Sequence, residues 1–391
     1  MTTYLLILAL LFVNFWGLRP LGALSSDMNL MLILAMLFYG YNKYGKKRKG
    51  IKIKGQYKYL IWIIVGILVS TIPTMMYYHQ DISTSLIVYR SQIILLTIPV
   101  LFKISPSTKE ISKALFMFAI FMFLANILIM SSADLFVRSE EAIMRYEQDP
   151  EQYKLRAVSG VSLLIIPLYY YLQKLRTAFN INTLLRIFFI FAVIYIAENR
   201  STLFPATILT LYGITKIKSK YKPLIISTVA VIAVVAFMKT AETWENLILE
   251  TQENIDDDDG NRNKALLFFT TAGQPSWVTY LFGNGMISKH TSNYTTMLME
   301  NGIFYSDVGF VGYWYNFGII PIIAMFTMFI KAFAPKRSYF IKLIVVHILI
   351  CGLTTSYFFL QGHLLLFMIF YYLYFYDKST FEQLLMQQKA L

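Results

Sequence analysis

Five arginine and histidine side chains of this sequence occupy positions where they could bind or transfer charge. Arg90 lies within an apolar segment, Arg200 lies between two such segments, and Arg156 precedes another. Arg262 and His290 lie in the longest polar stretch of the chain. Guanidinium groups bind phosphate oxygens through a planar fork of donors, and an imidazole accepts protons near neutral pH. These residue types predict a site for a phosphate-bearing lipid at a membrane surface.

Arg200 has the most rigid predicted setting of the five. One apolar segment ends at about residue 198 and the next begins at about residue 202, so almost no loop separates them. Ser201 can cap the second helix, and Pro205 is tolerated in its first turns. A cation supported by two helices at a helix N-terminus suits pyrophosphate binding. The alternative interpretation is a hairpin tip with a local contact between Glu198 and Arg200.

Three of the other residues, and Asp307, also have structural explanations without a function. Arg90 could extend its guanidinium to the membrane interface, and Arg156 could be an ordinary interfacial arginine. Exposed loop histidines such as His290 often have no chemical role. Asp307, at the end of the polar stretch, could cap a helix or act as a base. Both kinds of interpretation remain open at this point.

The carboxylates of the polar stretch do not have the pattern of a metal site. The run Asp256–Asp259 resembles the Asp-x-Asp of sugar-nucleotide transferases, but a solvated acidic turn is the preferred interpretation. A calcium loop would need a glycine and a terminal glutamate at defined spacings. No two histidines or carboxylates have metal-ligand spacing. We therefore expect neither a metal nor another cofactor.

The composition predicts that helices crossing a membrane position these residues. Hydrophobic residues make up 57% of the 391 residues and charged residues 15%, with a mean hydropathy of +0.55. A span needs about 20 mostly apolar residues. We predict an all-α polytopic membrane protein with about twelve transmembrane helices and one large extracytoplasmic loop. The predicted spans are about 3–18, 27–42, 59–77, 85–102, 112–131, 158–173, 183–198, 202–216, 223–239, 307–330, 340–356 and 361–376.

The basic residues predict the orientation of these spans. With the loops numbered alternately from the inside, most of the 35 lysine and arginine residues fall in the inner set. Basic residues favour the cytoplasmic side, so both termini are expected there and the long loop outside. The predicted parts are an N-terminal bundle, 1–240, the large loop, 241–306, and the C-terminal spans with a cytoplasmic tail, 307–391.

The order of several short motifs resembles the O-antigen polymerase and O-antigen ligase superfamily. Such proteins often carry Arg-x-x-x-Gly at the opening of a middle span and Arg-Ser at a tight outer hairpin, matched by Arg156–Gly160 and Arg200-Ser201. Their large loop carries Gly-x-Arg and then Phe-Gly-x-Gly, matched by Gly260–Arg262 and Phe282–Gly285. A Phe-Gly-Ile-Ile stretch follows in a span, matched by Phe317–Ile320. The match covers about residues 150–330.

The resemblance implies a glycosyl transfer from an undecaprenyl-diphosphate-linked oligosaccharide. A sugar hydroxyl of the acceptor attacks the anomeric carbon and the lipid diphosphate leaves, without a metal or a nucleotide sugar. Arginines would stabilise the charge that develops on the leaving diphosphate. The residues assigned to these roles are Arg200, Arg262, Arg156 and Arg90 for the diphosphate, with His290, Asp307 and Glu300 as candidate bases.

Within this superfamily the sequence favours a polymerase of repeat units over a ligase. The ligase pattern usually has His followed by Asn, whereas His290 is followed by Thr291. The expected location is a bacterial inner membrane, with the active site facing the periplasm. Expected partners are the lipid-linked glycan as donor and acceptor, membrane lipid and a chain-length regulator protein, but no nucleic acid. The alternatives are the ligase, which transfers glycan to lipid A core, and a flippase or transporter of lipid-linked glycans.

Overall fold

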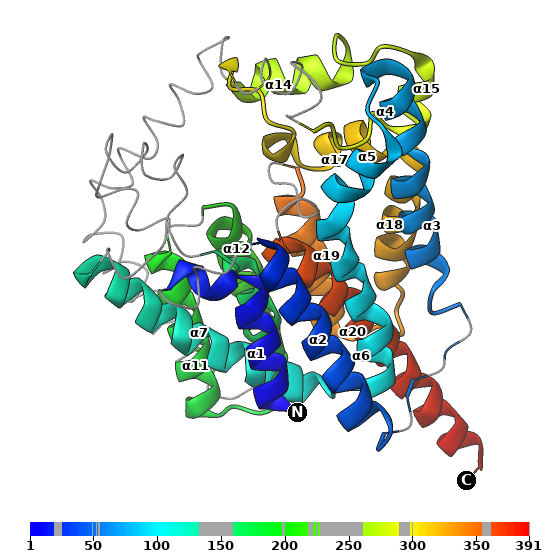
Figure 1. Cartoon of the computed structure of the whole chain (residues 1–391). Helices are drawn as coiled ribbons and strands as arrows, with labels where there is room; N and C mark the ends of the chain where they lie inside the picture. The colour runs from blue at the N-terminus through cyan, green and yellow to red at the C-terminus, as the bar shows by residue number, and fades with distance from the viewer. Residues whose placement is uncertain are drawn as a thin grey trace.

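The fold of the chain was obtained as a computed structural model. It describes residues 1–18, 26–48, 50, 51, 53, 55–132, 159–197, 200–217, 222, 223, 226, 261–288, 298, 300–353 and 361–390. Throughout these ranges the regular elements are helices, which confirms the predicted all-α class. We call the end of the bundle that carries α14 (Asn261–Thr270) the loop end. Helix α1 begins and α20 ends at the opposite end (Figure 1).

The elements follow one another along the chain with several short 3-10 segments between the α-helices. The first half contains α1 (Thr2–Phe12), η1 (Asn14–Gly17), α2 (Ser26–Gly45), α3 (Lys58–Val69), α4 (Thr71–Tyr78), α5 (Ile82–Val88), η3 (Tyr89–Leu96), α6 (Thr97–Ile104) and α7 (Thr108–Ser131). The second half contains η5 (Val161–Leu164), α10 (Ile165–Thr177), α11 (Ile181–Ile196), α12 (Arg200–Thr215), α14, α15 (Trp277–Phe282), η6 (Tyr305–Val308), α17 (Gly309–Phe317), α18 (Ile319–Ala332), α19 (Tyr339–Cys351) and α20 (Gln361–Ala390).

Two helical stretches in the described part of the chain are long and apolar enough to cross a membrane. They are Lys58–Tyr78, which joins α3 and α4, and Thr108–Ile129 within α7. Buried helices of soluble proteins can share this length and composition, so the predicted set of twelve spans is not confirmed. Seven further apolar helices are shorter than a full span.

Three of the predicted spans are interrupted in the structure. The predicted span 3–18 ends early, because Asn14, Phe15 and Trp16 have positive φ angles that no α-helix accommodates. The predicted span 85–102 is divided into α5, η3 and α6. The predicted span 307–330 is divided at Gly318, where φ is +76°. Continuous hydropathy therefore predicts the apolar segments but not the breaks within them.

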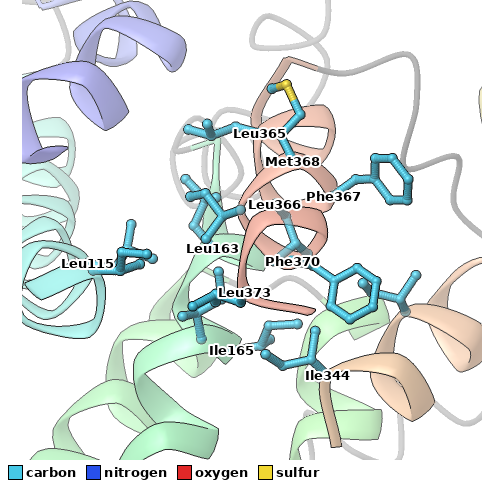
Figure 2. Close-up of a cluster of buried hydrophobic side chains, with 14 of the residues drawn as sticks. Leu115, Leu163, Ile165, Ile344, Leu365, Leu366, Phe367, Met368, Phe370 and Leu373 are labelled. Carbon is cyan, nitrogen blue, oxygen red and sulfur yellow. The ribbon is translucent and has the colours of Figure 1, made fainter. Parts of the chain in front are cut away.

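The first half of α20 forms the centre of the bundle. Every residue from Leu364 to Phe375 is buried, which is typical of a helix that is apolar on all faces. It packs against α1, α6, α19, η3 and η5. Figure 2 shows Leu366, Phe370 and Leu373 of this helix among Leu163 and Ile344 from other elements.

A smaller apolar cluster holds α14 at the loop end. Its buried members are Ala265 and Phe269 of α14 with Leu298, Val308 and Tyr315. Helix α14 therefore packs onto α17, and Figure 1 shows α14 and α15 above that helix. The predicted division into parts 1–240, 241–306 and 307–391 stays a prediction.

At the opposite end of the bundle, an ion pair fixes the basic stretch that follows α2. Arg48 donates two hydrogen bonds to the carboxylate of Glu110, at 2.8 and 3.1 Å. Glu110 also completes a capping box with Ser107 at the start of α7. Arg48 donates a third bond to the carbonyl of Ser105. This arginine therefore joins three separate backbone segments.

Candidate functional site

The residues predicted to bind diphosphate are described to different extents. Arg156 and His290 lie outside the described residues. Arg200 is the first residue of α12 and Arg262 the second of α14, but their side chains lie outside the described part. The same holds for the side chain of Asp307, whose backbone forms part of η6. The predicted convergence of these groups therefore stays a prediction.

Arg90 is the one predicted arginine whose side chain is described. It lies in η3, and its Nη1 is 2.8 Å from Oδ1 of Asp27 in the first turn of α2. The side chains of Arg90 and Asp27 are 44% and 68% exposed. Such an exposed pair contributes only about 0–1 kcal/mol to the stability of the fold. Arg90 therefore faces the surface beside α2 and not the centre of the bundle.

Glu300 is the remaining carboxylate predicted as a base, and Asp81 is a second carboxylate in the described part of the chain. Glu300 is exposed, and the description of the chain is continuous from it to residue 353. Asp81 caps α5 by accepting a 2.7 Å bond from the N–H of Thr84. Hydrogen bonds from the side chain and the N–H of Thr84 lower the pKa of Asp81. Asp81 thus has a structural role at the turn between α4 and α5.

The Gly-x-Gly turn, a weak signal in the sequence, lies at the centre of the loop end. Asn284 is completely buried and its N–H donates to the carbonyl of Tyr315 at 2.8 Å. Its amide Nδ2 donates to Gln274 at 3.1 Å, and its Oδ1 accepts a 3.1 Å bond from Tyr78. A buried amide with all these partners specifies one conformation of the turn.

Two glycines allow this turn to cross the break between α17 and α18. Gly283 has φ +81° and ψ 169°, and Gly318 has φ +76° and ψ −172°, a region open essentially only to glycine. A Cβ on Gly318 would lie 2.6 Å from the carbonyl carbon of Phe282 and 2.7 Å from the nitrogen of Gly283. Side chains cannot be accommodated at such distances. The crossing therefore brings Phe282–Gly285 and Phe317–Ile320, two of the motifs that carry the resemblance, into backbone contact.

The sequence interpretation missed a set of buried polar side chains on the elements facing this turn. They belong to α4, α5, η3 and the turn after α4, and their sequence signal is the spacing of polar residues along apolar segments. The members are Ser70, Thr74, Gln80, Ser85 and Tyr89, together with the partly buried Tyr78. Ser70, Thr74 and Tyr78 recur every four residues, which places them on one helix face. That spacing could have identified this face in advance.

A second buried polar group lies away from the turn, between α10 and α19. His347 is fully buried, and its Nδ1 lies 2.8 Å from the hydroxyl of Tyr169. One turn further along α19, the thiol of Cys351 donates to the carbonyl of Ser201 at 2.8 Å. His347 is enclosed by the bundle, and His363 is also buried.

The described residues contain no group of three or more histidine, cysteine, aspartate or glutamate side chains arranged to hold a metal ion. Comparison with protein-family models, curated proteins and solved structures finds no match for this chain.

Proposed function

We propose that the protein is a membrane glycosyltransferase that polymerises undecaprenyl-diphosphate-linked oligosaccharide repeat units into a surface polysaccharide. The observation that carries the proposal is the backbone crossing of Gly283 and Gly318. It gives a physical reason for two separate motifs of the resemblance, because neither glycine can be replaced without a clash. A surface-exposed arginine in a non-α segment, Arg90, adds an anion-binding group near the same elements.

In the proposed reaction, the hydroxyl oxygen of the acceptor sugar bonds to the anomeric carbon of the donor. The bond between that carbon and the diphosphate oxygen breaks, and the lipid diphosphate leaves with both electrons. Arg200, Arg262, Arg156 and Arg90 bind the diphosphate and stabilise its developing charge. His290 accepts the proton of the hydroxyl, with Asp307 and Glu300 as the alternative bases. The donor bond is already activated, so the proposal needs no metal and no other cofactor.

The proposed setting is a bacterial inner membrane, with the loop end on the periplasmic side and both termini in the cytoplasm. Two helical stretches of spanning length support membrane insertion. The many exposed apolar side chains on α2, α3, α4 and α7 support it further, because a soluble protein rarely exposes so continuous an apolar surface. About twelve spans are proposed, some of them as interrupted helices. Interrupted helices are tolerated at membrane depth where protein surrounds them.

Reconstitution of the purified protein with a lipid-diphosphate-linked repeat unit tests the function. EDTA is present and nucleotide sugars are absent, and the products are separated on a gel. We expect a ladder of multimers that is lost in Arg200→Ala and Arg262→Ala. Arg176→Ala is the matched control, because Arg176 stacks on Tyr339 at the end of α10 and has no proposed substrate contact. Transfer only onto an added lipid A core acceptor would identify the ligase instead.

A flippase or transporter of lipid-linked glycans is the second candidate. The interruptions at η3 and at Gly318 favour it, because broken helices often form transporter binding sites. Movement of a labelled lipid-linked glycan across a liposome bilayer, without any ladder, would support this candidate and refute the polymerase.

A further inference from the structure

The segment that follows the Gly-x-Gly turn is held largely by hydrogen bonds from side chains. Residues 283–288 contain no helix and bond α4, the turn between α4 and α5, and η3 on one side and α17 on the other. On the α17 side the N–H of Gly285 donates to the carbonyl of Asn316 at 2.7 Å. Figure 1 shows α4, α5, α15 and α17 gathered at the loop end.

Tyr89 provides the first of these side-chain contacts. Its hydroxyl accepts a 3.2 Å hydrogen bond from the N–H of Met286 and lies 2.9 Å from the hydroxyl of Ser70. Thr74 adds a 2.7 Å bond from its hydroxyl to the carbonyl of Asn284. A Cβ on Gly285 would lie 2.7 Å from the Tyr89 oxygen, so the glycine allows the close approach.

Gln80 provides the second set of contacts and is 1% exposed. Its Oε1 accepts a 2.7 Å bond from the N–H of Ser288. Its Nε2 donates to the carbonyl of Met286 at 3.2 Å and to the hydroxyl of Ser85 at 2.9 Å. One amide therefore bonds two backbone groups of the segment, and Ser85 fixes the orientation of that amide.

The four backbone groups bonded in this way all bond side chains on the same side of the segment. The carbonyl of residue 284, both groups of residue 286 and the N–H of residue 288 bond Thr74, Gln80 and Tyr89, whereas the N–H of Gly285 bonds α17. Gly285 has a φ of +70°, so the segment is not a regular strand, and the side chains hold its backbone groups individually. The segment is thereby held in one register against the helices.

We propose that Tyr89 and Gln80 are positioning residues that fix the segment 286–288 relative to Arg90. Arg90 directly follows Tyr89 in η3, and His290 lies two residues beyond Ser288 in the chain. The same hydrogen bonds therefore fix two places relative to each other. One is η3, which carries Arg90, and the other is Ser288, which precedes the proposed base in the chain. The expected effect of these residues on catalysis rests on the proposed glycosyl transfer. Their hydrogen bonds to the segment can be tested without an activity assay.

Hydrogen exchange of the peptide covering residues 283–288 tests the contacts directly. Tyr89→Phe removes the acceptor of the Met286 N–H, and Gln80→Leu removes the acceptor of the Ser288 N–H. Each loss of a buried hydrogen bond is expected to raise exchange at the affected amide about tenfold. Gln80→Glu keeps an acceptor for Ser288 and should exchange less than Gln80→Leu at that amide.

The matched control is Tyr280→Phe, because the Tyr280 hydroxyl bonds the carbonyl of Thr270 and does not contact the segment. The control should leave exchange of residues 283–288 unchanged. In the polymerisation assay, Tyr89→Phe and Gln80→Leu are expected to lower kcat about tenfold or more, with KM for the lipid-linked donor within about twofold. A purely structural role would lower the amount of folded protein and leave kcat per folded molecule unchanged.

The outcomes separate the two proposals. Unchanged exchange in both variants would overturn the positioning role, whether or not the protein is a polymerase. Raised exchange with unchanged kcat would also overturn the positioning role, because catalysis would then not require a fixed segment. Raised exchange with lowered kcat supports the positioning role. A wild-type protein without polymerase activity would refute the proposed function alone, and the exchange data would still decide whether Tyr89 and Gln80 hold the segment.

Discussion

Replacement of Gly318 by alanine should destabilise the protein far more than an ordinary glycine replacement. The backbone at Gly318 occupies a region that costs an alanine about 1–3 kcal/mol. The new Cβ would also lie 2.6 Å from the carbonyl carbon of Phe282, and such overpacking costs about 1–3 kcal/mol more. The expected loss is therefore about 2–6 kcal/mol of unfolding free energy.

Thermal unfolding of the detergent-solubilised protein measures this loss, and we expect Tm to fall by roughly 2–7 °C. Gly55→Ala is the matched control, since Gly55 also has a positive φ of +78° but no atom within 4 Å of the new Cβ. In Gly55→Ala the positive φ acts without a clash and should lower the unfolding free energy by only about 1–2 kcal/mol. If Gly318→Ala and Gly55→Ala have the same Tm, the close crossing of the two backbones is not a determinant of stability.

Three further changes are expected to have smaller, defined effects. Glu110→Gln should lower the unfolding free energy by about 1 kcal/mol in a denaturant titration, since the pair is partly exposed, and its effect should be smaller in an Arg48→Ala background, where only the capping role of Glu110 remains. Arg90→Ala removes an exposed guanidinium and should weaken binding of inorganic pyrophosphate, measured by calorimetry, about twofold to fivefold; unchanged affinity would mean that Arg90 does not bind the anion. Tyr169→Phe leaves a buried imidazole nitrogen without its hydrogen bond and should lower the unfolding free energy by about 1–3 kcal/mol, whereas an unchanged Tm would show that the bond contributes nothing.

The sequence predicted the apolar helices better than their ends. The predicted spans 27–42, 59–77 and 112–131 correspond to α2, to α3 with α4, and to α7. Hydropathy averages over many residues, so it detects the segment as a whole. It cannot detect a backbone break that one residue causes, as at Gly318, because that break depends on the chain segment that crosses there.

The candidate site was predicted from residue types. Such a search finds charged side chains more readily than uncharged polar ones. Arg90 was identified because a charge in an apolar segment is conspicuous, and the structure gives it a partner in Asp27. Asn284 and Gln80 were overlooked because uncharged amides in loops are common. Their importance depends on burial and on partners about 200 residues away in the chain, which no local pattern encodes.

The burial of α20 constrains how the protein can be assembled during synthesis. Its residues from Leu364 to Phe375 are surrounded by α1, α6 and α19, all of which precede it in the chain. Until the ribosome has made this helix, the faces of α1 and α6 that it covers must contact lipid, water or a chaperone. Compaction of the bundle is therefore a late event in biogenesis, and intermediates that lack α20 are the species most exposed to degradation.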